Sequence, residues 1–67
     1  MIMTKLEIQK ALDSEKTIKC GLTKYVKNPD STIKKSFPNM ADMEYTDFNQ
    51  FWACDFSMLT ILGCTVL

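Results

Sequence analysis

The segment that decides the fold is KTIKCGLTKYVKNPDSTIKKSF, residues 16–37. Its first half alternates between apolar and polar residues, and this period of two predicts one half-buried strand over residues 16–27. Asn28-Pro29-Asp30-Ser31 then predicts a type I turn, because proline at the second position already has the required φ. The alternation resumes over residues 32–37, so the segment predicts a β-hairpin. The inner face of its first strand is expected to hold Ile18, Cys20, Leu22 and Val26.

The register of this hairpin follows from placing Lys27 opposite Thr32. The same register places Lys24 opposite Lys35 on the inner face, which is unfavourable because like charges directly across a sheet repel. We therefore expect either that the hairpin tip projects beyond the core or that these two lysines meet acidic residues elsewhere in the fold.

One helix is expected before the hairpin in the chain and one after it. Thr4-Lys5-Leu6-Glu7 is a capping-box pattern that predicts a short helix over residues 5–13. After Pro38, Asn39 is a second candidate cap, and aromatic residues at helical spacing predict a helix over residues 40–53. That aromatic stripe consists of Tyr45, Phe48, Phe51 and Trp52.

The last segment, residues 56–67, is apolar on both faces and predicts a strand that is central in the sheet or covered by a partner. The expected fold is therefore α+β: a small single domain over residues 1–67, with the order α-β-β-α-β. We expect an antiparallel sheet of about three strands with two helices on one face.

The charges divide the chain into two halves. All eight lysines lie between Lys5 and Lys35, so residues 1–35 carry a balance of +4, whereas residues 36–67 carry four acids and no base. The net charge of zero therefore hides a separation of charge along the chain. Such a separation says more about binding partners than about the fold.

Size and composition bound the class of protein. A chain of 67 residues can bury only a small core of marginal stability. Its three scattered cysteines, in a sequence without histidine, predict neither a zinc site nor a disulfide framework. They indicate reduced thiols in a cytoplasmic protein, and self-association, as a homodimer or other homo-oligomer, is the remaining common source of stability. No cofactor and no metal is expected. The charge-free run at residues 56–67 is too short to cross a membrane, so no membrane association is expected either.

Catalysis has little basis in this sequence. There is no histidine to act as a base, and a cysteine nucleophile would lack its usual partner. The terminal tetrapeptide Cys64-Thr65-Val66-Leu67 loosely matches a prenylation signal, but it lacks a polybasic segment before it and continues the apolar run. The sequence therefore predicts a protein that is not an enzyme.

The favoured hypothesis is a protein-interaction module whose acidic, aromatic half contacts a larger host protein. Absence of arginine beside eight lysines suggests an AT-rich genome, and small size suggests a phage or mobile-element inhibitor, with a defence nuclease as a natural target class. If the gene is of phage origin, the protein acts in the cytoplasm of the host cell. The candidate partner-binding residues are Asp42, Met43, Glu44, Tyr45, Asp47 and Trp52.

Two alternatives remain open. The first is a nucleic-acid-binding module that uses the lysine-rich hairpin as a phosphate-tracking surface with one stacking ring, although lysines also serve simply to keep an exposed strand edge soluble. The second is an assembly subunit that pairs with another chain through its C-terminal strand. The candidate nucleic-acid-binding residues are Lys19, Lys24, Tyr25, Lys27, Lys34 and Lys35.

Overall fold

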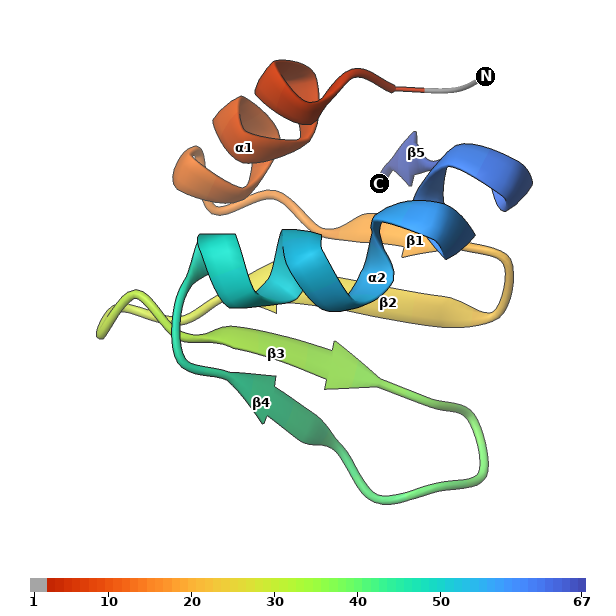
Figure 1. The fold of residues 1–67 in the computed structure, drawn as a ribbon. Coiled ribbons are helices and arrows are strands. Elements are labelled where there is room, and N and C mark those ends of the chain that lie inside the picture. Colours follow the sequence, from red (N-terminus) through yellow and green to blue (C-terminus); the bar gives the residue numbers. More distant parts are fainter. Residues whose placement is uncertain (1–2) are drawn as a thin grey trace.

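The computed structural model describes residues 3–67 as two helices and five short strands around one core (Figure 1). The α+β class is confirmed, but the sheet has five strands and not three. The elements, in chain order, are α1 (Lys5–Asp13), β1 (Ile18–Cys20), β2 (Thr23–Lys27), β3 (Ile33–Ser36), β4 (Met43–Tyr45), α2 (Phe48–Leu62) and β5 (Thr65–Val66).

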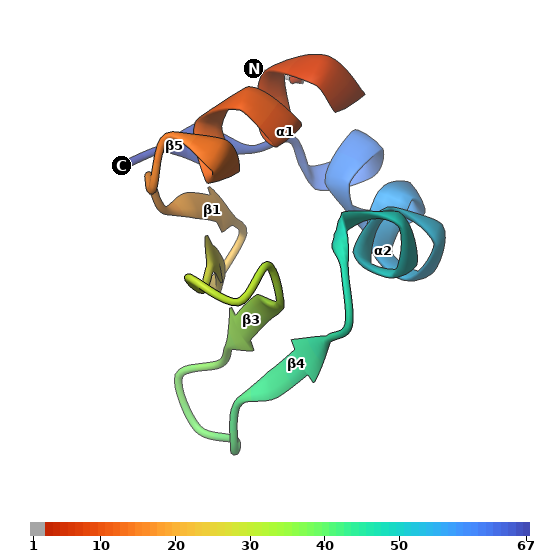
Figure 2. The ribbon, with the colours of Figure 1, turned by 90° about the vertical axis from the view of Figure 1, so that its left-hand side faces the viewer.

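The strands form one antiparallel sheet in the order β4-β3-β2-β1-β5. Helix α1 packs on β1 and β2, and α2 packs on β1 and β4. Both helices lie on the same side of the sheet, as the sequence predicts, and the other side carries no helix (Figure 2). The sheet therefore has a covered face, which contains the core, and an open face.

Helix α1 is the element that the sequence predicts most closely. Thr4 Oγ1 accepts from the Glu7 amide at 3.2 Å, and Glu7 Oε1 accepts from the Thr4 amide at 2.9 Å, which completes the capping box. The pKa of Glu7 is lowered because its carboxylate accepts from the Thr4 backbone and hydroxyl. The buried residues of this helix are Ile8, Ala11 and Leu12.

The single strand predicted over residues 16–27 is wrong. The chain turns back at Gly21 and Leu22, so that Cys20 lies opposite Thr23. Gly21 has a φ of +61°, a left-handed conformation that glycine adopts without a steric cost. The tight turn shifts the alternation by one residue, which exposes Leu22 and turns Tyr25 into the core.

The turn over Asn28–Ser31 is confirmed, but the register predicted from it is wrong. The Ser31 amide donates to the Asn28 carbonyl at 3.0 Å, and the Asn28 amide donates to the Thr32 carbonyl at 2.8 Å. Ser31 has a φ of +74°, which makes this a type I turn followed by a left-handed bulge residue. The extra loop residue brings Lys27 opposite Ile33 rather than Thr32.

Residues 40–67 differ most from expectation. The predicted helix over residues 40–53 begins only at Phe48, with Asp47 rather than Asn39 as its N-cap, and it continues to Leu62. Residues 43–45 form the edge strand β4. The strand predicted over residues 56–67 is therefore mostly the second half of α2, and what remains of it is the two-residue strand β5.

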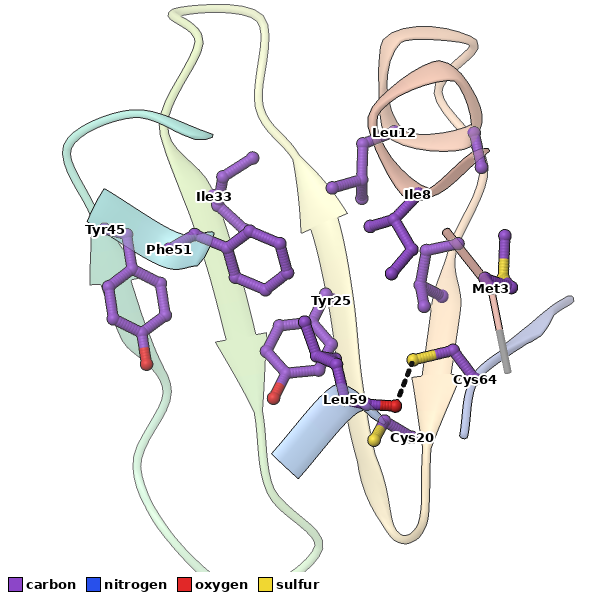
Figure 3. Close-up of a cluster of buried hydrophobic side chains, with 12 residues drawn as sticks. Met3, Ile8, Leu12, Cys20, Tyr25, Ile33, Tyr45, Phe51, Leu59 and Cys64 are labelled. Atoms are coloured by element: carbon purple, nitrogen blue, oxygen red, sulfur yellow. Dashed lines mark hydrogen bonds between the residues drawn. The ribbon is translucent and has the colours of Figure 1, made fainter. Parts of the chain in front are cut away.

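The core lies between α1, α2 and the covered face of the sheet (Figure 3). Phe51 is fully buried at its centre, and its ring packs edge-on against Tyr25 at a centroid distance of 5.0 Å. The largest fully buried side chains are Tyr25, Phe51, Ile8, Leu12, Ile18, Ile33, Leu59 and Cys20.

We predict that Phe51→Ala lowers the free energy of unfolding by about 3–5 kcal/mol, because it removes a ring that is enclosed on all sides. Phe56→Ala is the matched control on the same helix, since that ring is 47 % exposed, and we expect it to cost less than about 1 kcal/mol. Urea unfolding of the two variants measures both values. Equal losses would contradict the described position of α2.

Candidate interaction surfaces

A buried carboxylate joins α2 to three strands. Asp55, which is 7 % exposed, accepts from the Tyr25 hydroxyl at 2.9 Å and from the Tyr45 hydroxyl at 3.0 Å. Lys35 Nζ lies 3.1 Å from the same carboxylate and 5.0 Å from the centroid of the Phe37 ring. The predicted inner-face position of Lys35 is correct, and Asp55 is the acid that it meets. The same prediction for Lys24 is wrong, because Lys24 lies opposite Ser36 and is exposed.

This Asp55 cluster removes three residues from the predicted binding surfaces. Tyr25 and Tyr45 are buried, and the Lys35 side chain is only 12 % exposed. Tyr25 is therefore not available as a stacking ring for nucleic acid, and Tyr45 is not available as a contact for a partner. In both cases the sequence reasoning was wrong because it assigned the residue to the wrong face or the wrong element.

The electrostatics of the Asp55 cluster keep both phenols protonated. Burial, with the adjacent Asp55 carboxylate, raises the pKa of Tyr45 to about 12. Burial and the same carboxylate also raise the pKa of Tyr25. Both hydroxyl groups remain hydrogen-bond donors across the neutral range, so the cluster acts as a fixed polar connection between α2 and the sheet.

The acidic residues predicted to bind a partner are exposed, but each has an internal contact. Asp42 Oδ2 lies 3.2 Å from Lys34 Nζ, and Glu44 accepts from the Thr32 hydroxyl at 3.2 Å. Asp47 caps α2 by accepting from the Gln50 amide at 2.8 Å. These contacts give each acid a structural role independent of a partner.

The remaining predicted partner residues, Met43 and Trp52, lie on different elements. Met43 is 49 % exposed on the edge strand β4. Trp52 is half-buried on α2, where Lys5 Nζ lies 5.7 Å from its ring centroid. The predicted partner-binding residues are therefore spread over β4, its flanking residues and α2.

The predicted lysine surface is also divided by the fold. Lys27 is paired with Asp13, Lys34 with Asp42, and Lys35 with Asp55. Lys19 and Lys24 are exposed on the open face of the sheet, directly opposite each other in the β1–β2 ladder. A like-charged cross-strand pair is unfavourable, so this pair is the part of the hairpin that most favours an anionic ligand.

The outer side of α2 is a surface that the sequence reasoning missed. Asp55 is the helix's one charged residue, and it points into the core, so the solvent-facing residues carry no charge. Phe56 is 47 % and Ile61 80 % exposed on this side. The run of fifteen residues with a single charge was the available signal, and its division into a helix over residues 40–53 and a strand over residues 56–67 concealed the helix face.

Aromatic rings extend the exposed surface along one flank of α2. Phe48 stacks on Trp52 at a centroid distance of 6.2 Å, and Trp52 packs on Phe56 at 6.3 Å. The rings run from the half-buried Phe48 to the exposed Phe56. At the other end of the helix Leu62 is 59 % exposed, and the Gly21–Leu22 turn approaches it, with Leu22 itself 75 % exposed.

Residues 3–67 contain no cluster of three or more histidine, cysteine, aspartate or glutamate side chains that could hold a metal ion. Within the same residues, neither helix is long and apolar enough to cross a membrane. Comparison of the chain with protein-family models, curated proteins and solved structures gives no match. Its function is therefore inferred from its own geometry.

We predict that Asp55→Asn lowers the free energy of unfolding by about 3 kcal/mol or more, because it leaves the poorly exposed Lys35 ammonium without its counter-charge. Lys35→Met in the same background should recover part of the loss, and a double-mutant cycle by urea unfolding measures the coupling. Asp42→Asn, which breaks an exposed ion pair, serves as the control and should cost less than about 1 kcal/mol. Additive losses at positions 35 and 55 would contradict the described contact.

We also predict a loss of stability at alkaline pH. The folded pKa of Tyr45 is about 12 and the unfolded value about 10, so its contribution is complete below pH 10 and is lost as the pH rises towards 12. The loss attributable to Tyr45 should reach about 3 kcal/mol, and Tyr25 adds to it in the same direction. Urea unfolding at several pH values tests this, because Tyr45→Phe should be less stable at neutral pH but show a shallower decline. Parallel curves for the two proteins would refute it.

Proposed function

We propose that this chain is a small protein-interaction module of the cytoplasm that binds a larger protein through the outer side of α2. The observation that supports the proposal is the exposure of Phe56 and Ile61 on a helix whose solvent-facing side carries no charge. Isolated exposed apolar residues are ordinary, but two large apolar side chains that flank an uncharged strip of helix, which includes Ser57 and Thr60, favour an interaction site.

The distribution of these side chains favours a concave partner. Phe56 and Ile61 are five residues apart, which places them about 140° apart around the helix axis. A flat or convex surface cannot contact both flanks of a helix at once, whereas a groove can. We therefore infer that the partner offers an apolar groove, in the manner of proteins that bind an amphipathic helix.

Two grooves on this chain do not offer such a site to a second copy. One lies between the end of α1 and the β2–β3 loop, and Asp13, Glu15 and Lys27 are among its lining residues. The other lies beside α1 and Val66 and is lined partly by Glu7, Lys10 and Lys16. Their charges do not match the uncharged face of α2, so a larger protein is favoured over a homodimer as the occupant.

The more specific hypothesis, a phage or mobile-element inhibitor of a host protein, is supported by small size and by lysine use without arginine. The acidic residues give this hypothesis less support than the charge pattern of the sequence suggests. Asp42, Glu44 and Asp47 each have a contact within the chain. In this proposal the affinity comes from Phe56 and Ile61 on the uncharged outer side of α2.

The proposal predicts that a photo-crosslinking residue at position 56 or 61 captures one protein in lysate of the source cells. The same residue at position 39, which is exposed in the loop between β3 and β4 and lies outside α2, is the matched control and should capture less. Phe56→Glu with Ile61→Glu should weaken binding of the captured protein at least tenfold in a purified assay, while Asn39→Glu, which adds a charge outside α2, should have a smaller effect. Circular dichroism confirms that the variants are folded.

Other outcomes of this experiment would overturn the proposal. Capture of a second copy, with a doubled mass in solution that the double glutamate variant abolishes, would identify α2 as a homodimer interface. Recovery of nucleic acid, with adducts that disappear on nuclease treatment, would move the function to the open face of the sheet. That alternative is favoured by the Lys19–Lys24 pair, and neutralising those two lysines would then reduce the salt dependence of binding.

A further inference from the structure

Two cysteines far apart in the sequence are neighbours across the sheet. Strands β1 and β5 pair antiparallel, with Ile18 opposite Val66 and Lys19 opposite Thr65. Continued by one residue, this register places Cys20 opposite Cys64. Residues directly opposite each other on antiparallel strands have their Cβ atoms about 4.5–5.5 Å apart, close to the separation that a disulfide spans.

The two thiols share one buried site. Cys20 is 1 % and Cys64 3 % exposed, and both belong to the core. Cys20 Sγ lies 3.7 Å from the Met58 carbonyl oxygen, and Cys64 Sγ lies 3.9 Å from the carbonyl oxygen of the next residue, Leu59. Figure 3 shows both sulfur atoms beside the end of α2. Burial, with the neighbouring Cys20 thiol, raises the pKa of Cys64 to about 12.

We propose that Cys20 and Cys64 form an intramolecular disulfide when the chain meets a small-molecule disulfide such as oxidised glutathione. One cysteine thiolate attacks the reagent, forms a mixed disulfide and releases one glutathione thiolate. The second cysteine thiolate then attacks the protein sulfur and releases the second glutathione. The protein loses two protons and two electrons, the glutathione disulfide bond is reduced, and the products are one protein disulfide and two thiols.

The position of the pair provides a route for the reagent. Strand β5 has two residues at the edge of the sheet, and both are exposed. Short edge elements open locally at a small fraction of the global unfolding cost. Opening of β5 exposes Cys64, and its return brings the mixed disulfide against Cys20.

The disulfide would fasten the C-terminal segment to the sheet. Beyond the β1–β5 ladder, one backbone bond holds the end of the chain, from the Leu67 amide to the Thr17 carbonyl at 2.9 Å. The bridge closes a loop over the 43 residues between the two cysteines. Loops of this length restrict the unfolded chain strongly, so the oxidised form should be the more stable one.

The third cysteine supplies a built-in control. Cys54 is exposed on the outer side of α2, whereas Cys20 and Cys64 are buried. It is expected to form a mixed disulfide with glutathione and to have no partner thiol within the chain. The test therefore uses the folded full-length chain with Cys54→Ala, with the unaltered protein in parallel.

The experiment incubates the folded chain with oxidised glutathione and maps the disulfides by mass spectrometry without reduction. We expect one product joining the peptides of Cys20 and Cys64, two hydrogens lighter than the reduced chain. Its Tm should be higher by roughly 10 °C or more, and dithiothreitol should reverse both changes. Cys20→Ala and Cys64→Ala should each take up one glutathione and form no internal bridge.

Several results would overturn the proposal. One is the formation of separate glutathione adducts on Cys20 and Cys64. Another is that Cys20 and Cys64 both stay free while Cys54 reacts. A third is a bridge that forms only in denaturant. A bridged product with a lower Tm than the reduced chain would also overturn it, because the native register would then not suit the bond. The mapping of the unaltered protein decides the matter even if the alanine variants fail to fold.

Discussion

The burial of one carboxylate organises this small domain. Asp55 is the single charge of α2, and it is surrounded by hydroxyl and ammonium donors from β2, β3 and β4. An unpaired buried carboxylate would cost several kcal/mol, so the helix can bury this residue only where Tyr25, Lys35 and Tyr45 meet. The contact therefore selects one rotation of α2 and one register of the strands, which hydrophobic burial alone does not distinguish.

The same contact changes the meaning of the charge pattern. The division into a basic and an acidic half suggests two surfaces of opposite sign, yet the fold brings the halves together. Lys27, Lys34 and Lys35 each reach an acid, and two of these acids come from the second half of the chain. Part of the charge separation is thus compensated inside the molecule. The lysines that take no part in these ion pairs are Lys5, Lys10, Lys16, Lys19 and Lys24, and the last two lie opposite each other on the open face.

Local signals allow part of the fold to be predicted, and long-range contacts determine the rest. Thr4 with Glu7, and the turn at Asn28–Ser31, depend on neighbouring residues, and both are correct. The two-residue turn at Gly21 is hidden because apolar residues continue the alternation on either side of it. Tyr45 falls at helical spacing from Phe48 and Trp52, yet it lies in β4, where its hydroxyl reaches Asp55. A buried aspartate in an apolar run has no local explanation, so the sequence predicts that the helix ends before Asp55 and that the apolar residues after it form a strand.

The candidate surface follows from the same physical constraint. With its one charge directed inward, α2 has no charged group to solvate its outer side, and Phe56 and Ile61 remain in water. A helix that merely covered a core would carry charges on that side, because such substitutions are inexpensive and improve solubility. The chain instead places a polar cluster inside and an uncharged helix face with exposed Phe56 and Ile61 outside, an arrangement that a partner's groove would complete.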